Sequence, residues 1–155
     1  MPRFICLGVL GWLAVGVAVG QDSPRPNFPA KATVTSKTTD DGRKLSIRVT
    51  VKLDPGWTVL ANPSGNPKIS TGQLRVRVHD KERFDSVEVR YPKGTPIKDD
   101  LLGEFNVYRD TVLVEVDITR RPNDTRAVKL DTRVLAFNNQ IGVQTGPAII
   151  NHQVP

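Results

Sequence analysis

Few side chains in this sequence could carry out chemistry, and their spacing restricts what that chemistry could be. The chain of 155 residues has two histidines, His79 and His152, and one cysteine, Cys6. Hydrolytic catalysis needs a base beside a nucleophile, and a zinc or copper site needs several His or Cys ligands. The two histidines are far apart in the sequence, so we predict two surface histidines, no catalytic residue, no metal site and no cofactor.

Two pairs of adjacent carboxylates are the next candidates. Asp40-Asp41 precedes Gly42, and Asp-Gly is a common dipeptide of tight hairpin turns, which explains this pair. Asp99-Asp100 precedes two leucines and could cap a short helical turn, bind a cation weakly or repel an unsuitable partner. We interpret the second pair as solvated charge in a loop.

The segments that position these residues alternate apolar and polar residues with a period of two. In RKLSIRVTVKLD, residues 43–54, every second residue from Leu45 to Leu53 is Leu, Ile or Val. This alternation is typical of a β-strand with one buried and one solvated face. Further segments that we predict to be strands are 31–38, 57–61, 73–80, 85–92, 111–120 and 127–137. No segment has a helical repeat longer than about two turns.

Short strands separated by Gly- and Pro-containing turns predict an all-β fold. The simplest arrangement is an immunoglobulin-like antiparallel β-sandwich of about seven to nine strands, in which we expect Trp57 to be a core residue. Function in such a sandwich usually lies in the loops at its ends. Two segments stand out as such sites: the loop PIKDDLLGEFNVYRD at 96–110, and VLAFNNQIGVQTGPAII at 134–150, which we expect to form a strand, a turn and a strand.

The N-terminus has the pattern of a secretory signal peptide. Arg3 precedes an apolar run from Phe4 to Val19, and small residues precede Gln21. We expect a signal peptide at 1–20 cleaved near Gly20-Gln21, a flexible Pro-rich leader at 21–30 and a single domain at 31–155. A retained anchor is the alternative, but the run is weaker than the roughly 20 apolar residues of a membrane span. The mature protein would be periplasmic or secreted, without stable membrane insertion and without Cys6.

The formal net charge is +6 at pH 7. Basic residues are distributed along the strands, as in QLRVRVHDKERF at 73–84, without a dense Lys/Arg run and with little aromatic interleaving. We therefore expect no nucleic-acid partner and interpret the basic residues as a solvated face. Attraction to an anionic envelope surface or to an acidic partner is the alternative.

The order of these features resembles the N-terminal periplasmic domain of the thiol:disulfide interchange protein DsbD. The resemblance covers roughly residues 31–150 and implies an immunoglobulin-like fold. The segments that carry it are DPGWTVLANPSGNP, a strand ending in VRYP, DDLLGEFNVYRDTVLVEVDI and LDTRVLAFNNQIGVQTGPA.

The resemblance also implies a redox site that this sequence lacks. Members of the family pass electrons from a membrane-embedded domain to periplasmic disulfide isomerases through two cysteines on a strand–turn–strand unit beneath a cap loop. Those cysteine positions fall at or next to Phe137 and Gln144, and the cap loop falls on 99–104, with Leu101 or Leu102 where an aromatic residue is expected. Dithiol exchange needs an attacking thiolate and a resolving thiol, so we expect that this chain is not an enzyme.

We favour a non-enzymatic module that binds another exported or envelope protein at the former redox site. Phe137 would be its apolar anchor, Leu101 and Leu102 the cap, Tyr108 a neighbour of the cap and Gln144 a polar contact. Simple core filling is the alternative for Phe137. Two other functions stay open: a component of a thiol–disulfide interchange system that acts with a cysteine-bearing partner, and a small ligand-binding sandwich, which would need exposed aromatic residues on a concave face.

Overall fold

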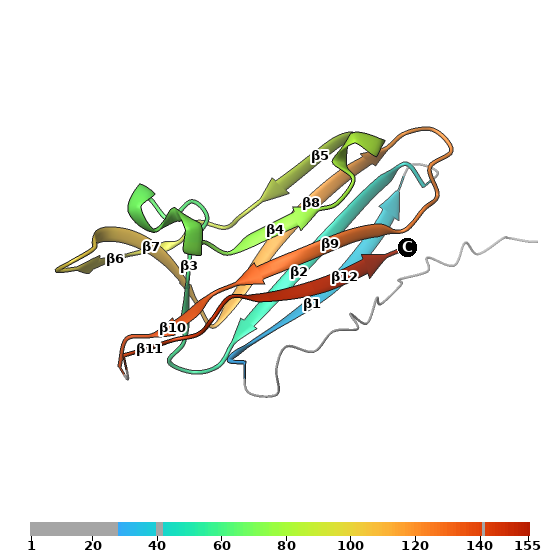
Figure 1. Ribbon diagram of the computed structural model, residues 1–155. Helices are drawn as coiled ribbons and strands as arrows, with labels where there is room; N and C mark the ends of the chain where they lie inside the picture. The colour runs from blue at the N-terminus through green and yellow to red at the C-terminus, as the bar shows by residue number, and fades with distance from the viewer. Residues whose placement is uncertain (1–27, 40–41, 141) are drawn as a thin grey trace, which may run out of the picture.

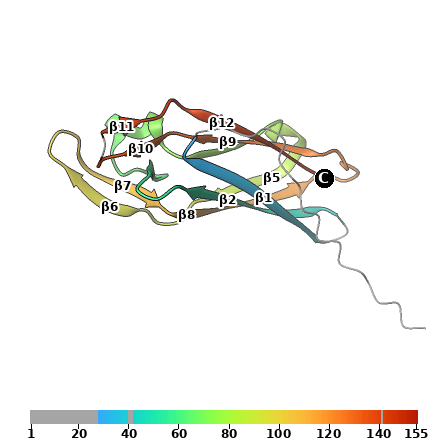
Figure 2. The ribbon, with the colours of Figure 1, turned by 90° about the horizontal axis from the view of Figure 1, so that it is seen from below.

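The computed structural model describes residues 28–39, 42–140 and 142–155, which form two packed layers of antiparallel strands (Figures 1 and 2). The expected signal peptide, most of the leader and the Asp40-Asp41 pair lie outside these residues. One layer has the order β1 (Ala30–Thr39), β2 (Lys44–Leu53), β8 (Thr111–Arg120) and β5 (Phe84–Arg90). The other has the order β12 (Ala148–Val154), β9 (Val128–Val134) and β4 (Arg75–Val78).

A third, five-stranded sheet forms one end of the sandwich (Figure 1). Its order is β11 (Val143–Gln144), β10 (Ala136–Asn138), β3 (Thr58–Leu60), β7 (Gly103–Arg109) and β6 (Thr95–Asp99). It continues both layers, because β10 follows β9 after one residue and β7 leads into β8 through Asp110, whose φ is 58°. Two short 3₁₀ helices complete the described elements, η1 (Pro67–Gly72) and η2 (Lys81–Arg83).

The core consists of the apolar residues that alternate along the long strands. In β2, the side chains from Leu45 to Val51 at every second position are at most 1% exposed, and the residues between them face outward. The register pairs β2 with β8 so that Val49 lies opposite Val114, which places two buried valines side by side. The period of two thus sets which face of each strand is removed from water.

The predicted all-β immunoglobulin-like sandwich is confirmed, but the described residues form twelve strands instead of the predicted seven to nine. The segment 96–110 corrects one expectation, since it forms the paired strands β6 and β7 rather than a loop. Pro96 is tolerated there because β6 is an edge strand and needs no N–H toward solvent. In the parts of the chain that the structure describes, no helix has the length and apolar character needed to cross a membrane.

Candidate functional site

A cavity of about 420 Å³ lies at the end of the sandwich that the five-stranded sheet forms, and residues of β7, β10 and β11 contribute to its wall. Its walls come from segments that are distant in the sequence: β3, η1, the β6–β7 turn and the strand–turn–strand unit after β9. The apolar residues in this wall include Leu60, Leu102, Phe105, Phe137 and Val143. The two segments that stand out in the sequence, 96–110 and 134–150, therefore both contribute to the wall of this cavity.

Phe137 and Gln144 lie directly opposite each other in the antiparallel pair of β10 and β11. The neighbouring pair on the side away from the turn, Ala136 and Thr145, is hydrogen-bonded, because the N–H of Thr145 donates to the carbonyl of Ala136 at 2.8 Å. Hydrogen-bonded and non-hydrogen-bonded pairs alternate, so Phe137 and Gln144 form a non-hydrogen-bonded pair, whose Cα atoms are typically about 4.5 Å apart. This separation lies within the range that a disulfide spans.

Phe137 is partly buried. It packs against a small buried cluster of Leu60, Phe105 and Val107 and also lines the cavity. Gln144 is exposed, and its neighbour Val143 is 46% exposed. Phe137 therefore fills space beneath the β6–β7 hairpin and keeps part of its surface accessible, so its partial burial is compatible with core filling and with the predicted partner contact.

The turn between β6 and β7 presents two leucines beside this cavity. The Oδ1 of Asp99 accepts hydrogen bonds from the N–H groups of Leu102 and Leu101, both at 2.9 Å, and these bonds lower the pKa of the Asp99 carboxyl. Gly103 completes the turn with a φ of 82°. Leu101 is 94% exposed and Leu102 is 44% exposed. Of the roles considered for the Asp99-Asp100 pair, the structure gives Asp99 the capping of a tight turn.

The same turn is tied to the loop that follows β3. The side-chain amide of Asn66 donates to the carbonyl of Leu102 at 2.7 Å. The amide oxygen of Asn66 accepts from the N–H of Lys68 at 3.0 Å and so also starts η1. One asparagine thereby holds together two walls of the cavity, a role that nothing in the local sequence indicated.

Tyr108 lies in the core, which corrects its assignment to the partner-binding residues. Its side chain is 6% exposed, and its hydroxyl donates to the carbonyl of Pro92 at 2.7 Å and accepts from the N–H of Asn62 at 3.2 Å. Burial raises the pKa of this hydroxyl. Tyr108 therefore positions the loop after β3 and is not available to a partner.

His152 also differs from its predicted place at the surface. It is 4% exposed, because it continues the inward alternation of Ile150 and Val154 along β12. Among residues 28–39, 42–140 and 142–155, neither ring nitrogen finds a hydrogen-bond partner, and burial lowers the pKa of the imidazole. His79 is partly exposed, and its Nε2 contacts the carboxylate of Asp131. No group of three or more His, Cys, Asp or Glu residues in the described ranges could hold a metal ion.

Comparison with solved structures relates this architecture to known proteins. No family model matches the sequence, and no curated protein matches it. The N-terminal periplasmic domain of ScsB from Proteus mirabilis matches with a TM-score of 0.62 and 16% identity, over 88% of this chain and 51% of that chain. The fold is that of a DsbD-type N-terminal domain. The chain spans about half the length of the ScsB structure.

Two structures from Neisseria meningitidis also match, at lower similarity. The complex between the DsbD and PilB N-terminal domains matches with a TM-score of 0.53 and 13% identity, over 86% of this chain and 88% of that chain. The reduced DsbD N-terminal domain gives a TM-score of 0.48 and 13% identity, over 70% of this chain and 75% of that chain. The likeness to the ScsB domain and to the DsbD–PilB complex establishes the fold alone, in agreement with the resemblance in the sequence.

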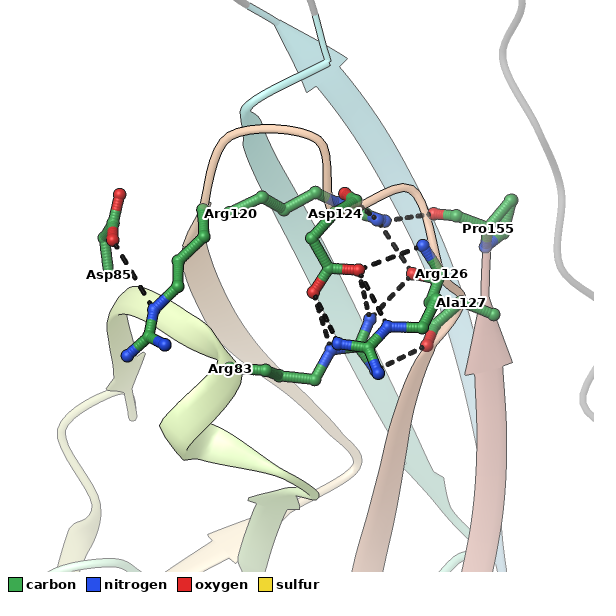
Figure 3. Close-up of polar contacts among 8 residues, drawn as sticks. Arg83, Asp85, Arg120, Asp124, Arg126, Ala127 and Pro155 are labelled. Atoms are coloured by element: carbon green, nitrogen blue, oxygen red, sulfur yellow. Dashed lines mark hydrogen bonds and ion pairs between the residues drawn. The ribbon is translucent and has the colours of Figure 1, made fainter.

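The opposite end of this DsbD-type sandwich carries a cluster of arginines around one aspartate (Figure 3). Asp124 accepts from the Nε and Nη2 of Arg83 at 2.8 and 3.1 Å, and hydrogen bonds from Arg126 and Arg83 hold the pKa of its carboxyl well below the usual range. Arg120 is buried and donates to the carbonyls of Asp124, Arg126 and Pro155. These contacts join the β8–β9 loop to η2 and to the end of β12, so the cluster is structural.

Trp57 is half-buried and packs against the main core, in partial agreement with its predicted place there. It also lines a second hollow of about 290 Å³ together with Arg109 and Gln140. One partly exposed tryptophan beside an arginine is less than the aromatic concave face that a ligand-binding sandwich would need.

Proposed function

We propose that this chain is a non-enzymatic interaction module that binds another exported protein. Its binding surface is the docking end, which we define as Leu101, Leu102, Phe137, Val143 and Gln144. The observation that carries the proposal is the exposure of Leu102 and Val143 in the wall of a cavity that Phe137 also lines, with the exposed Leu101 next to Leu102 in the same turn. Exposed apolar groups that gather around a hollow, with an aromatic residue inside it, have the character of a protein interface.

The residues at the docking end argue against dithiol exchange by the chain itself. Cys6 is the only cysteine in the sequence, and Phe137 and Gln144 occupy the paired positions at which the resemblance places two thiols. Neither side chain can attack a disulfide or resolve a mixed disulfide. The module would therefore retain the shape of the site and use it for contact alone.

Two further observations favour an exported protein partner. The ScsB match is a periplasmic domain, and the Neisseria DsbD domain forms a complex with the PilB N-terminal domain. The apolar run from Phe4 to Val19 gives this chain the pattern of an exported protein. Burial of one leucine side chain contributes about 1.5–3 kcal/mol, so Leu101 and Leu102 could together anchor a contact.

The test is crosslinking in the intact envelope of the native host, followed by affinity purification and quantitative mass spectrometry. Leu101→Asp and Phe137→Ala should each reduce the recovered partner at least tenfold, because both remove apolar surface from the docking end. Leu113→Asp is the matched control, since Leu113 is a partly exposed leucine on β8 in the four-stranded layer. Circular dichroism and thermal melting establish that each variant is folded.

Equal recovery of the same proteins by wild type, Leu101→Asp and Phe137→Ala would contradict the proposal. Thiol–disulfide exchange by the purified protein would contradict its non-enzymatic part. We expect no exchange above the rate of a buffer blank in either the reducing or the oxidising direction.

A further inference from the structure

The outward face of the three-stranded sheet carries four cations in neighbouring positions. Arg75 on β4 lies opposite Arg133 on β9, and Arg133 lies opposite Ile149 on β12. One step along, Arg77 lies opposite Asp131, and Lys129 follows on β9. We define the cationic face as Arg75, Arg77, Lys129, Arg133 and Ile149. Adjacent strands are about 4.8 Å apart and alternate residues about 6.8 Å apart, so the four charges lie within roughly two Debye lengths and their fields add.

This arrangement places four cations around a single carboxylate, that of Asp131. Like charges directly opposite each other on neighbouring strands destabilise a sheet, and Arg75 and Arg133 are such a pair. Among the described residues, no ion pair within 4 Å involves any of the four cations, Arg75, Arg77, Lys129 and Arg133. The one carboxylate on this face, that of Asp131, contacts His79. The face therefore keeps a net positive charge.

The arginines on the opposite layer are arranged differently. Arg48 pairs with Glu115 at 3.7 Å, and Arg90 pairs with Glu88 at 3.2 Å and also contacts Asp117. Acidic residues on β5 and β8 thus neutralise the arginines of the four-stranded sheet. Arg75, Arg77 and Arg133, which have no ion pair among those described, belong to the three-stranded sheet, whose strands β9 and β12 lie on the opposite side of the sandwich from β2 and β8 (Figure 2).

We propose that the cationic face rests against an anionic phospholipid surface. Charge complementarity with the lipid headgroups is the main reason. The centre of a protein–protein interface is depleted of charge, whereas the centre of this face consists of Arg, Lys and Asp. Ile149 lies in the same row as Arg75 and Arg133 and is 59% exposed, which places one aliphatic side chain among the cations, as at a membrane boundary.

The geometry allows this contact and the docking end to be used together. The cationic face lies along β4, β9 and β12, whereas Leu101, Leu102 and Phe137 lie at the end of the sandwich (Figure 1). A chain that rests on lipid through the face would keep its end free. The lipid contact is independent of the proposed function, and each can fail without the other.

Co-sedimentation of the purified protein with vesicles tests the proposal. Vesicles of phosphatidylglycerol and phosphatidylcholine should bind wild type at low salt, and vesicles of phosphatidylcholine alone should not. Arg75→Gln with Arg133→Gln should weaken binding at least tenfold, because each basic residue near an anionic surface contributes a factor of about five. Removing the like-charge pair should leave the melting temperature unchanged or higher, so loss of folding would not explain the result.

Lys31→Gln with Lys52→Gln is the matched control. These lysines also lie opposite each other, on β1 and β2 of the other layer, and the substitutions remove the same charge. Retained binding by this control and reduced binding by Ile149→Ser would support the lipid contact. Equal weakening by both double variants would overturn it in favour of non-specific attraction by net charge. Binding to polyglutamate without binding to vesicles would overturn it in favour of an acidic protein partner.

Discussion

Phe137 illustrates how one residue can fill space and remain available for contact. Its ring packs against Leu60, Phe105 and Val107, and it also borders the cavity. A thiol would fill much less of this volume. The aromatic side chain therefore fits the proposed use of this surface for contact with a partner.

The hydroxyl of Tyr108 provides a residue-level test of the corrected site. Tyr108→Phe removes the hydrogen bond to the Pro92 carbonyl and leaves the partly buried N–H of Asn62 without the hydroxyl that accepts from it. We expect the free energy of unfolding to fall by about 1–3 kcal/mol, measured by urea denaturation. Crosslinking to the partner should be unchanged. A variant of wild-type stability that no longer captures the partner would return Tyr108 to the binding surface.

His152 makes stability depend on pH. Burial lowers its pKa from 6.5 in the folded protein, so protonation favours the unfolded chain. The contribution of neutral His152 to the free energy of unfolding should be present in full above about pH 6.5. As the pH drops from there toward the lowered pKa of the folded protein, the free energy of unfolding should fall by at most about 1.4 kcal/mol per pH unit. His152→Leu should flatten this dependence in denaturation experiments between pH 7.5 and pH 5. An unchanged slope in the variant would show that other groups cause the loss.

Strands β10 and β11 carry Phe137 and Gln144, the two positions at which the resemblance to DsbD-type domains places a pair of cysteines. Their register makes Phe137 and Gln144 a non-hydrogen-bonded pair, and the side chain of Thr58 further fixes β10 through a hydrogen bond to the Phe137 carbonyl at 3.1 Å. An element with this geometry should hold two cysteines close enough to bond.

Restoring a cysteine pair tests that geometry. In a Cys6→Ser background, Phe137→Cys with Gln144→Cys should form an intramolecular disulfide under mild oxidation, detected as a loss of two mass units and of both free thiols. The two single variants should form no intramolecular bond. Thiols that stay free in the double variant, while the protein remains folded, would contradict the assigned equivalence.

The long strands could be predicted from the sequence because their period of two directly reflects burial. β2 and β8 follow this rule over their full length. The β6–β7 hairpin was missed because Pro96, Asp99 and Gly103 are residues of turns, and their tolerance in or beside strands depends on an edge position and on the Asp99 cap. His152 was missed because its polarity outweighed its inward place in the alternation of β12.

At the scale of the whole molecule, the important neighbours come from distant parts of the chain. Arg75 and Arg133 meet only through the pairing of β4 with β9, and Asn66 reaches the Leu102 carbonyl across separate loops. Neither contact can be predicted from the spacing of these residues in the sequence. The same topology separates the docking end, the cationic face and the structural arginine cluster around Asp124 (Figures 1 and 3).

This separation allows the central claim to be tested across the whole surface. A photo-crosslinking amino acid is placed, one site at a time, at Leu101, Val143, Leu113 or Ile149, all of which are exposed. Irradiation is carried out in the native envelope, and adducts are identified by mass spectrometry. We predict that one specific exported protein is attached from Leu101 and Val143 and not from Leu113 or Ile149. Absence of a protein adduct from both Leu101 and Val143, or equal yields of the same adduct from Leu113, would contradict a docking role for this end of the sandwich.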